Sequence, residues 1–425
     1  MVTQSPLNAG IAEVDITAGA GVELAGDLCT TNSTGIDTPL TAKALVLSDG
    51  RESVALVALD LWGLSPADVV TTAIADSTGL RPESIMLASS HTRGAPCTAP
   101  AVGCSGPADE YLSEIVPRIA SAVAQAQSQL QDASIGVGHA QLPHLVYNHR
   151  LLTRNLKAVS AWLDLPRNEV LAPEGPVDPG FDVVVVRDAG GDPLCFLWVF
   201  AADNRFPSGS SISAGLPHCV QRELDARLQR RVPCLYFPGC GGDVSFTGDL
   251  TQTADAVASA VMAVQLETPA DPVARLACAR ERAVLPIRDY SQHWSRPDIE
   301  LKCPEAVERF AREVELLQQE GARAVPTSIQ VLRIGRLALV GLPGMPFVEL
   351  ALQIKCGSPF GDTIVAGNIN DGLGPIPTRH AFDNEGFEAW PSRAARVGPG
   401  AGEFMAAEAI ALLRELHRSR RMETA

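Results

Sequence analysis

A glycine-rich segment at 239–245 (GCGGDVS) carries the side chains of this chain that are best suited to nucleophilic chemistry. Glycines let a backbone approach a ligand closely and turn its N–H groups toward an anion or an oxyanion. Ser245 or Cys240 could serve as a nucleophile if a base lies near, and Asp243 could orient a partner. The alternative is a tight turn in which Asp243 only satisfies backbone donors.

Polar residues also follow four other predicted strands. In an open α/β sheet, the carboxyl ends of the strands form the ligand crevice, so we expect these segments to converge on one pocket. His91 and Asp203 are the candidate bases, and Arg93 suits a carboxylate or phosphate group. The alternatives are a structural histidine and a surface ion pair. With the glycine-rich segment, the five polar segments are 89–94, 202–205, 239–245, 343–346 and 368–372.

Strand and helix patterns alternate along the chain, which predicts an α/β fold of mixed sheets with surrounding helices. Two hairpins are expected, one around Asp49-Gly50 and one around Gly190-Gly191. The predicted strands are 41–48, 53–59, 84–88, 182–187, 194–200, 233–237, 338–342 and 363–366, and the predicted helices are 109–130, 216–229, 304–320 and 401–417.

Composition limits the partners of the protein. A net charge of −15 disfavours binding to nucleic acid or to an anionic membrane. The chain shows no secretion signal and no apolar run of about 18 residues, and its ten cysteines form no close C-x-x-C pair. We therefore expect a cytoplasmic protein that acts on a small molecule. The excess of Arg over Lys suggests GC-rich, bacterial coding.

The order of several segments resembles the catalytic N-terminal domain of the neutral, non-lysosomal ceramidases. The segment 90–96 (SHTRGAP) is similar to that family's S-H-T-H-S-G-P, and 342–349 (LPGMPFVE) to its L-P-G-E-P-F-V-E. The other matching segments are 8–17, 39–50, 58–60, 148–150, 239–245, 376–379 and 398–403.

The resemblance covers nearly the whole chain and implies a single ceramidase-like domain over 1–425. Longer members add a C-terminal immunoglobulin-like domain, which the match does not reach. The proline-rich stretch 150–181 is then either a lid over the site or a surface loop, and we expect the tail 418–425 to be frayed.

Members of that family hydrolyse the amide of ceramide with a zinc-bound water, and the resemblance implies two His, one Glu and one Tyr around the metal. Only His91 keeps its residue type, and a nearby family Asp is replaced by Gly215. Catalytic zinc needs about three protein ligands, thioether sulfur is too soft for this role, and glycine has no side chain. The remaining family positions carry Arg93, Asp203, Met345 and Gly372.

Three hypotheses remain. The favoured one is metal-independent amide or acyl chemistry (hydrolysis, acyl transfer or cyclisation) on a small polar substrate, with no cofactor, Ser245 as nucleophile and His91 or Asp203 as base. The second is a zinc-dependent amidohydrolase with a rebuilt site, in which His91 and Asp203 gain a third ligand such as His218 or Asp371. The third is a non-catalytic ligand-binding protein. The candidate substrate contacts are Arg93, Arg150, Asn204, Arg205, Cys240, Gly241, Gly242, Asn370 and Arg379.

Overall fold

Two β-sheets lie face to face in the computed structural model, which describes residues 6–25, 31–162, 167–288 and 304–423. The larger sheet has eight strands in the order β16-β14-β13-β8-β1-β5-β6-β7. Its strands are β1 (Asn8–Asp15), β5 (Thr41–Ser48), β6 (Ser53–Leu59), β7 (Ile85–Ser89), β8 (Gln131–Gln141), β13 (Gly180–Asp188), β14 (Pro193–Phe200) and β16 (Cys234–Pro238). Its pairings are antiparallel except for the two edge pairs, β6–β7 and β14–β16.

The smaller sheet has the order β18-β19-β20-β22. Its strands are β18 (Leu276–Pro286), β19 (Ala324–Ile334), β20 (Leu337–Gly341) and β22 (Asp362–Ala366). Short strands pair around the sheets: β2 (Glu23–Leu24) with β3 (Thr31–Asn32), β4 (Gly35–Ile36) with β15 (Ser211–Ile212), β9 (Val146–Asn148) with β17 (Val244–Phe246), and β21 (Met345–Pro346) with β23 (Pro375–Ile376).

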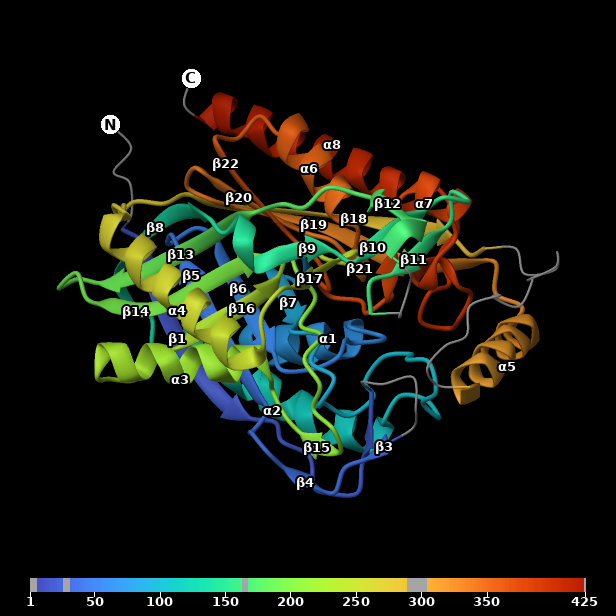
Figure 1. Ribbon diagram of the computed structural model, residues 1–425. Helices are drawn as coiled ribbons and strands as arrows, with labels where there is room; N and C mark the ends of the chain where they lie inside the picture. Colours follow the sequence, from blue (N-terminus) through green and yellow to red (C-terminus); the bar gives the residue numbers. More distant parts are fainter. Residues whose placement is uncertain (1–5, 26–30, 163–166, 289–303, 424–425) are drawn as a thin grey trace.

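Helices cover both outer faces, so the molecule has four layers, helix–sheet–sheet–helix (Figure 1). Alternate side chains of each strand face opposite layers. In β5, Leu45 and Leu47 enter the core between the sheets, whereas Ala44 and Val46 face α1 and α2. The helices are α1 (Asp68–Thr78), α2 (Asp109–Ser128), α3 (Leu216–Leu228), α4 (Leu250–Glu267), α5 (Pro304–Glu320), α6 (Val348–Gly357), α7 (Arg379–Asp383) and α8 (Ala401–Glu423).

The α/β class with mixed sheets is confirmed, and both predicted hairpins form, as β5–β6 and β13–β14. Helices α1, α4, α6 and α7 were not predicted. The last helix continues to Glu423, past the expected end at 417 and into the tail that we expected to be frayed. None of the described helices combines the length and apolar character that crossing a bilayer requires.

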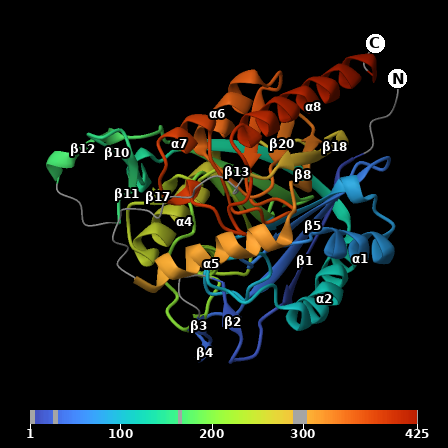
Figure 2. The same cartoon turned by 90° about the vertical axis from the view of Figure 1, so that its right-hand side faces the viewer.

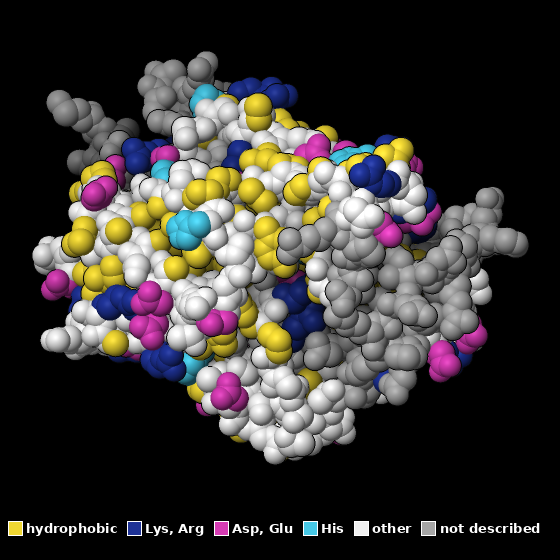
Figure 3. All heavy atoms as spheres, in the orientation of Figure 1, with side chains coloured by type: hydrophobic (Ala, Val, Ile, Leu, Met, Phe, Trp, Pro, Cys, Tyr) yellow, Lys and Arg dark blue, Asp and Glu magenta, His cyan; other side chains and the backbone are white. Residues whose placement is uncertain are grey.

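Two peripheral segments depart from the layers. Within 150–181, β10 (Arg150–Thr153), β11 (Ala158–Ser160) and β12 (Val170–Pro173) form a small antiparallel sheet. Helix α5 lies apart from the two helical layers, on the side that faces the viewer in Figure 2. Its Glu313 binds Arg393 by an ion pair of 2.8 Å. The face shown in Figure 3 carries basic, acidic and apolar side chains interspersed over its described part.

Candidate active site

The five predicted polar segments meet through a closed ring of contacts between the loops that follow β7, β14, β16, β20 and β22. Because β20 and β22 belong to the smaller sheet, the ring joins the ends of both sheets. The loop after β7 joins the loop after β14 through His91 Nδ1 and Asp203 Oδ1 (2.7 Å), and the loop after β14 joins the loop after β16 through Asp203 N and Val244 O (2.9 Å). The loop after β16 joins the loop after β20 through Gly242 N and Pro346 O (3.0 Å). The loop after β22 closes the ring, with Asn368 N bonded to Gly344 O and Asn368 O to Ser89 N (3.1 Å).

His91 and Asp203 form a buried pair within this ring. The imidazole stacks on Trp62, with ring centroids 3.8 Å apart, and its Nδ1 binds Asp203 Oδ1. Arg205 Nε donates to the other carboxylate oxygen at 3.0 Å. Burial acts to raise the pKa of Asp203, but the imidazole and the guanidinium groups of Arg205 and Arg93 outweigh it and hold the pKa well below its usual range. Asp203 is therefore a weak base whose two oxygens are both engaged.

A second chain of hydrogen bonds contains the glycine-rich segment's serine. Ser245 Oγ lies 2.9 Å from Nδ1 of His149, and Nε2 of the same ring lies 3.0 Å from Oε1 of Glu388. β17, which carries Ser245, pairs antiparallel with β9, and His149 follows β9 directly. The arrangement is a nucleophile, a base and an orienting carboxylate within hydrogen-bond reach of one another.

The charge of Glu388 fixes which nitrogen of His149 carries the proton. Burial acts to raise the pKa of Glu388, but Arg150 and His149 outweigh it and lower the pKa far below its usual range, so the carboxylate is ionised. An ionised carboxylate only accepts hydrogen bonds, so Nε2 holds the proton and Nδ1 accepts from the hydroxyl of Ser245. Burial lowers the pKa of His149 from its usual value, which keeps the ring neutral at pH 7 despite the opposing effect of Glu388.

Arg150 holds Glu388 in place. Its Nη1 donates to Glu388 Oε2 at 2.5 Å, and its Nε and Nη2 donate to Glu174. Nη2 also donates to the carbonyl oxygen of Glu385 at 2.7 Å. The side chain, expected to contact substrate, is 1% exposed and lies behind Glu388, where it orients the carboxylate.

Ser245 opens on a cavity of about 380 Å³. Arg205 forms part of its wall and stacks over the ring of Trp162, 4.2 Å from the ring centroid. Trp162 comes from the proline-rich stretch, so part of the segment interpreted as a lid borders this cavity. The lining residues are Tyr147, Trp162, Asp203, Arg205, Phe206, Pro207, Ser245, Phe246, Gly248, Asp249 and Leu250.

The glycines of the 239–245 segment face neighbouring backbone. A Cβ at Gly242 would lie 2.3 Å from the carbonyl oxygen of Met345, and one at Gly241 would lie 2.7 Å from the backbone of Ala202. The amides of Gly239 and Gly242 donate to backbone carbonyls, which removes them as oxyanion donors. Cys240 is 1% exposed, and burial raises the pKa of its thiol, so it stays protonated.

Asp243 connects three parts of the fold. Its Oδ1 accepts from the amide of Val348, which opens α6, and its Oδ2 accepts from Asn148 Nδ2, both at 2.8 Å. Burial raises the pKa of this carboxyl to about 7, although the same hydrogen bonds act to lower it. These contacts give Asp243 a structural role, because it ties β9 and the start of α6 to the segment that carries Ser245.

The remaining expected substrate contacts lie in four different settings. Asn204 lines a second cavity. Asn370 is buried and bonds to the amide of Leu87 and to Gln330. Arg379 is exposed at the start of α7 and lines neither described cavity, whereas Arg93 is half-buried and its charge acts on Asp203.

The donor set at the family's metal positions does not fit zinc. Nδ1 of His91 binds Asp203, so only Nε2 of this ring could bind a metal, and both oxygens of Asp203 are already engaged by His91 and Arg205. At Gly372 a Cβ would lie 3.0 Å from the side chain of Ala99, so the position has no room for a large metal-binding side chain such as tyrosine. Asp371 accepts from Ala67 N and Thr327 Oγ1 instead. Within the described ranges, no group of three or more His, Cys, Asp and Glu side chains is placed to hold a metal ion.

Sequence reasoning missed His149 and Glu388. His149 lies in the segment 148–150 that carries part of the family resemblance, but no spacing separated it from the other histidines. Glu388 lies in a short 3₁₀ turn, Phe387–Ala389, where we predicted neither an element nor a motif. No local signal links either residue to Ser245.

Comparison with known proteins shows the fold. No family model and no curated protein matches the chain. Among solved structures, a neutral ceramidase from Pseudomonas aeruginosa superposes with a TM-score of 0.73 at 17% identity, covering 97% of this chain and 75% of that one. A ceramidase complexed with C2 gives a TM-score of 0.72 at 16% identity, covering 98% and 76%. The ceramidase-like fold expected from the sequence is therefore confirmed.

Proposed function

We propose that the protein is a metal-independent serine amidase or esterase, or an acyltransferase with the same first step. The observation that carries this proposal is the chain Ser245–His149–Glu388, whose serine end opens on a cavity. The likeness to amide-cleaving ceramidases supports the reaction class. The cavity lies near the lower end of the roughly 300–1,000 Å³ of small-molecule sites, which supports a small substrate.

In the first step, Ser245 Oγ forms a bond to the acyl carbon of the substrate while the hydroxyl proton moves to Nδ1 of His149. The resulting imidazolium is stabilised by the carboxylate of Glu388 through Nε2–H. The tetrahedral intermediate then breaks its bond to the leaving amine or alcohol, which takes the proton from Nδ1. Water, an acceptor alcohol or a second nucleophile of the substrate then passes its proton to Nδ1 of His149 and bonds to the acyl carbon. The bond from this carbon to Ser245 Oγ breaks, the serine takes the proton back, and the acid, ester or ring product leaves.

Arg205 supplies the positive charge in this scheme. It shares the cavity wall with Ser245 and is held by Asp203 and by the face of Trp162. The amides of Gly239, Gly242 and Val244 are bonded to backbone carbonyls, and we assign the guanidinium of Arg205 as the donor to the charge on the substrate's acyl oxygen. His91 then acts through Asp203, by fixing the carboxylate that holds Arg205.

The zinc alternative would need about three metal-binding side chains, whereas only His91 and Asp203 among the residues at the family's ligand positions could bind the ion. The steps above therefore use side chains of the protein alone. A ligand-binding protein without catalysis would keep the cavity but would have no need of a base bonded to the serine. We also propose a small-molecule partner in place of nucleic acid or a membrane, in keeping with the net charge of −15.

Labelling by a fluorophosphonate tests the proposal without knowledge of the substrate. The reaction forms a bond from Ser245 Oγ to phosphorus, breaks the P–F bond and passes the hydroxyl proton to His149. We expect one label per chain, mapped to Ser245 by peptide mass spectrometry, in the presence of a zinc chelator. Ser245→Ala should abolish the label, and Ser77→Ala, which changes a serine on α1, should not. Labelling at another residue, or none on folded protein, would overturn the proposal.

A further inference from the structure

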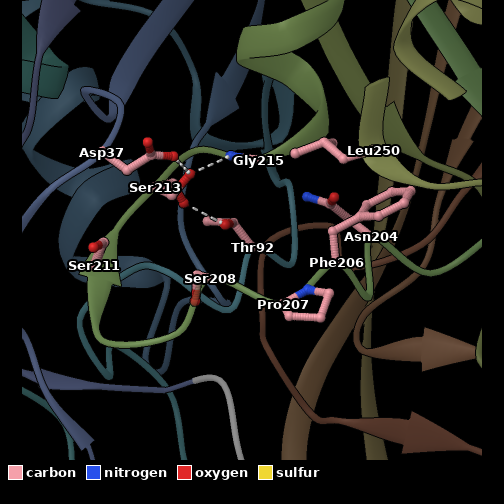
Figure 4. A pocket seen from close by; sticks show the side chains of 10 residues that line it. All are labelled: Asp37, Thr92, Asn204, Phe206, Pro207, Ser208, Ser211, Ser213, Gly215 and Leu250. Carbon is pink, nitrogen blue, oxygen red and sulfur yellow. Dashed lines mark hydrogen bonds between the residues drawn. The ribbon is translucent and has the colours of Figure 1, made fainter. Parts of the chain in front are cut away.

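A second cavity of about 240 Å³ adjoins the one that contains Ser245. The two cavities share Phe206, Pro207 and Leu250 in their walls. Neighbouring residues of one loop face different cavities, since Asp203 and Arg205 line the first and Asn204 lines the second. The second cavity is lined by Asp37, Thr92, Asn204, Phe206, Pro207, Ser208, Ser211, Ser213, Gly215 and Leu250 (Figure 4).

A buried acceptor lies in the wall of this second cavity. Asn204 is 2% exposed, and its Nδ2 donates to the carbonyl of Ser90 at 3.2 Å, which sets the orientation of the amide. Oδ1 accepts no hydrogen bond from any residue that the structure describes. Buried polar atoms in proteins almost always have a partner, so this acceptor is available to a donor from a molecule that enters the cavity.

Gly215 keeps the space in front of this acceptor open. The point at which a Cβ would project from it lies 3.5 Å from Asn204 Oδ1 and 3.7 Å from Thr92 Oγ1. The backbone of Gly215 has φ +65°, which side-chain-bearing residues rarely adopt, so the position favours glycine and an empty volume. The family Asp that the resemblance implies at this position would fill that volume.

The lining also selects for positive charge. Asp37 contributes a carboxylate, whose Oδ2 accepts from Ser213 Oγ at 3.2 Å, and none of the lining residues is basic. A single carboxylate with neutral oxygens is poor in charge for a divalent cation, which takes six to eight oxygen ligands for calcium. An ammonium group has N–H donors for the amide oxygen of Asn204, and the exposed carboxylate of Asp37, which lies on the other side of Ser213 in Figure 4, attracts its positive charge.

We propose that this second cavity binds a primary ammonium group, and that the substrate of the serine chemistry carries one. The site assignment stands on the cavity itself, whereas the statement about the substrate rests on the proposed function. The reaction would then act on an aminoacyl or amine-bearing amide or ester whose ammonium group is held apart from Arg205. An ammonium bound beside the guanidinium would be repelled, and the division of residues between the two cavities avoids this.

Ligand-observed NMR with butylammonium tests the site directly, with butyltrimethylammonium as a probe of equal charge that lacks N–H donors. We expect butylammonium to bind about tenfold more tightly, the size of effect expected for charged hydrogen bonds. Asp37→Asn should weaken binding about twofold to fivefold, as the loss of one exposed charge predicts. Asp132→Asn removes an equal charge from β8 and should change nothing.

Asn204→Leu removes the buried acceptor and should weaken butylammonium about tenfold. If that variant does not fold, the Asp37→Asn result still decides. Equal affinity for both probes, or equal binding by Asp37→Asn and wild type, overturns the assignment. Ser245→Ala should bind butylammonium as wild type does, so failure of this site and failure of the serine chemistry are separate results.

Discussion

Replacing Glu388 by Gln removes the charge that fixes the proton on Nε2 of His149. The two side chains are wholly buried and 3.0 Å apart, so the change is confined to one hydrogen bond of nearly unchanged length. Glutamine can present either its oxygen or its amide nitrogen to the ring. When it presents the nitrogen, Nε2 must accept, the proton moves to Nδ1, and Ser245 loses its base.

The magnitude follows from the geometry. An imidazolium and a carboxylate 3.0 Å apart attract by about 5.5 kcal/mol at an effective dielectric constant of about 20. Glutamine keeps a dipole but no net charge, so we expect roughly half of this, about 3 kcal/mol, to be lost from the transition state. That corresponds to a loss of roughly a hundredfold in rate. Arg150 retains Glu174 and the carbonyl of Glu385, so we expect a stability cost of about 1–3 kcal/mol, below that of a wholly unpaired buried charge.

The assay is the rate constant of fluorophosphonate labelling at Ser245 as a function of pH, with urea unfolding of the same samples. Glu388 acts to raise the pKa of His149 against the effect of burial. Its neutralisation should therefore move the acid limb of the labelling profile to lower pH, which a merely structural defect would not do. Glu385→Gln is the matched control, because it removes an exposed carboxylate from the same segment, where Glu385 pairs with Lys157.

A folded Glu388→Gln protein that labels at the wild-type rate would refute this reasoning. So would a slower rate with an unchanged acid limb, since the carboxylate would then only support the fold. In either case the hydrogen bond from Glu388 to His149 would be a structural contact, and the base for Ser245 would have to be sought elsewhere.

Further predictions concern the base, the metal and the glycine-rich segment. His149→Gln should slow labelling of Ser245 at least about a hundredfold, whereas His139→Gln, which alters a half-exposed histidine paired with Asp182, should leave it unchanged. Because burial lowers the pKa of His149 and the neutral ring is the active form, the wild-type labelling rate should fall as pH is lowered through a midpoint below that of an ordinary histidine, and a midpoint above the ordinary value would contradict the assignment. Elemental analysis after zinc supplementation and dialysis should find less than about a tenth of an equivalent per chain, because fewer than three donors are placed for the ion; a stoichiometric ion would restore the zinc hypothesis. Gly242→Ala should lower the free energy of unfolding by about 1–3 kcal/mol, since the added methyl meets a backbone oxygen, and an unchanged urea midpoint would show that the loop can yield.

Local patterns in the sequence determined the fold class and the places where chemistry could occur. The apolar runs on either side of Asp49-Gly50 predict a hairpin because the turn and the strand period are properties of neighbouring residues, and β5 and β6 form as expected. The same holds for the polar segments, which follow strands and therefore gather at the ends of the sheets. Helix α4 was missed because its buried side is built largely from Ala and Val, which give little contrast with the rest of the helix.

Only the tertiary structure decided which residues form the chemical chain. Ser245 and His149 are 96 positions apart, and His149 and Glu388 are 239 apart. They meet because β9 pairs with β17 and because the turn at Phe387–Ala389 lies against Arg150. Contacts of this range depend on how whole layers pack, and no spacing within a single segment of sequence encodes them.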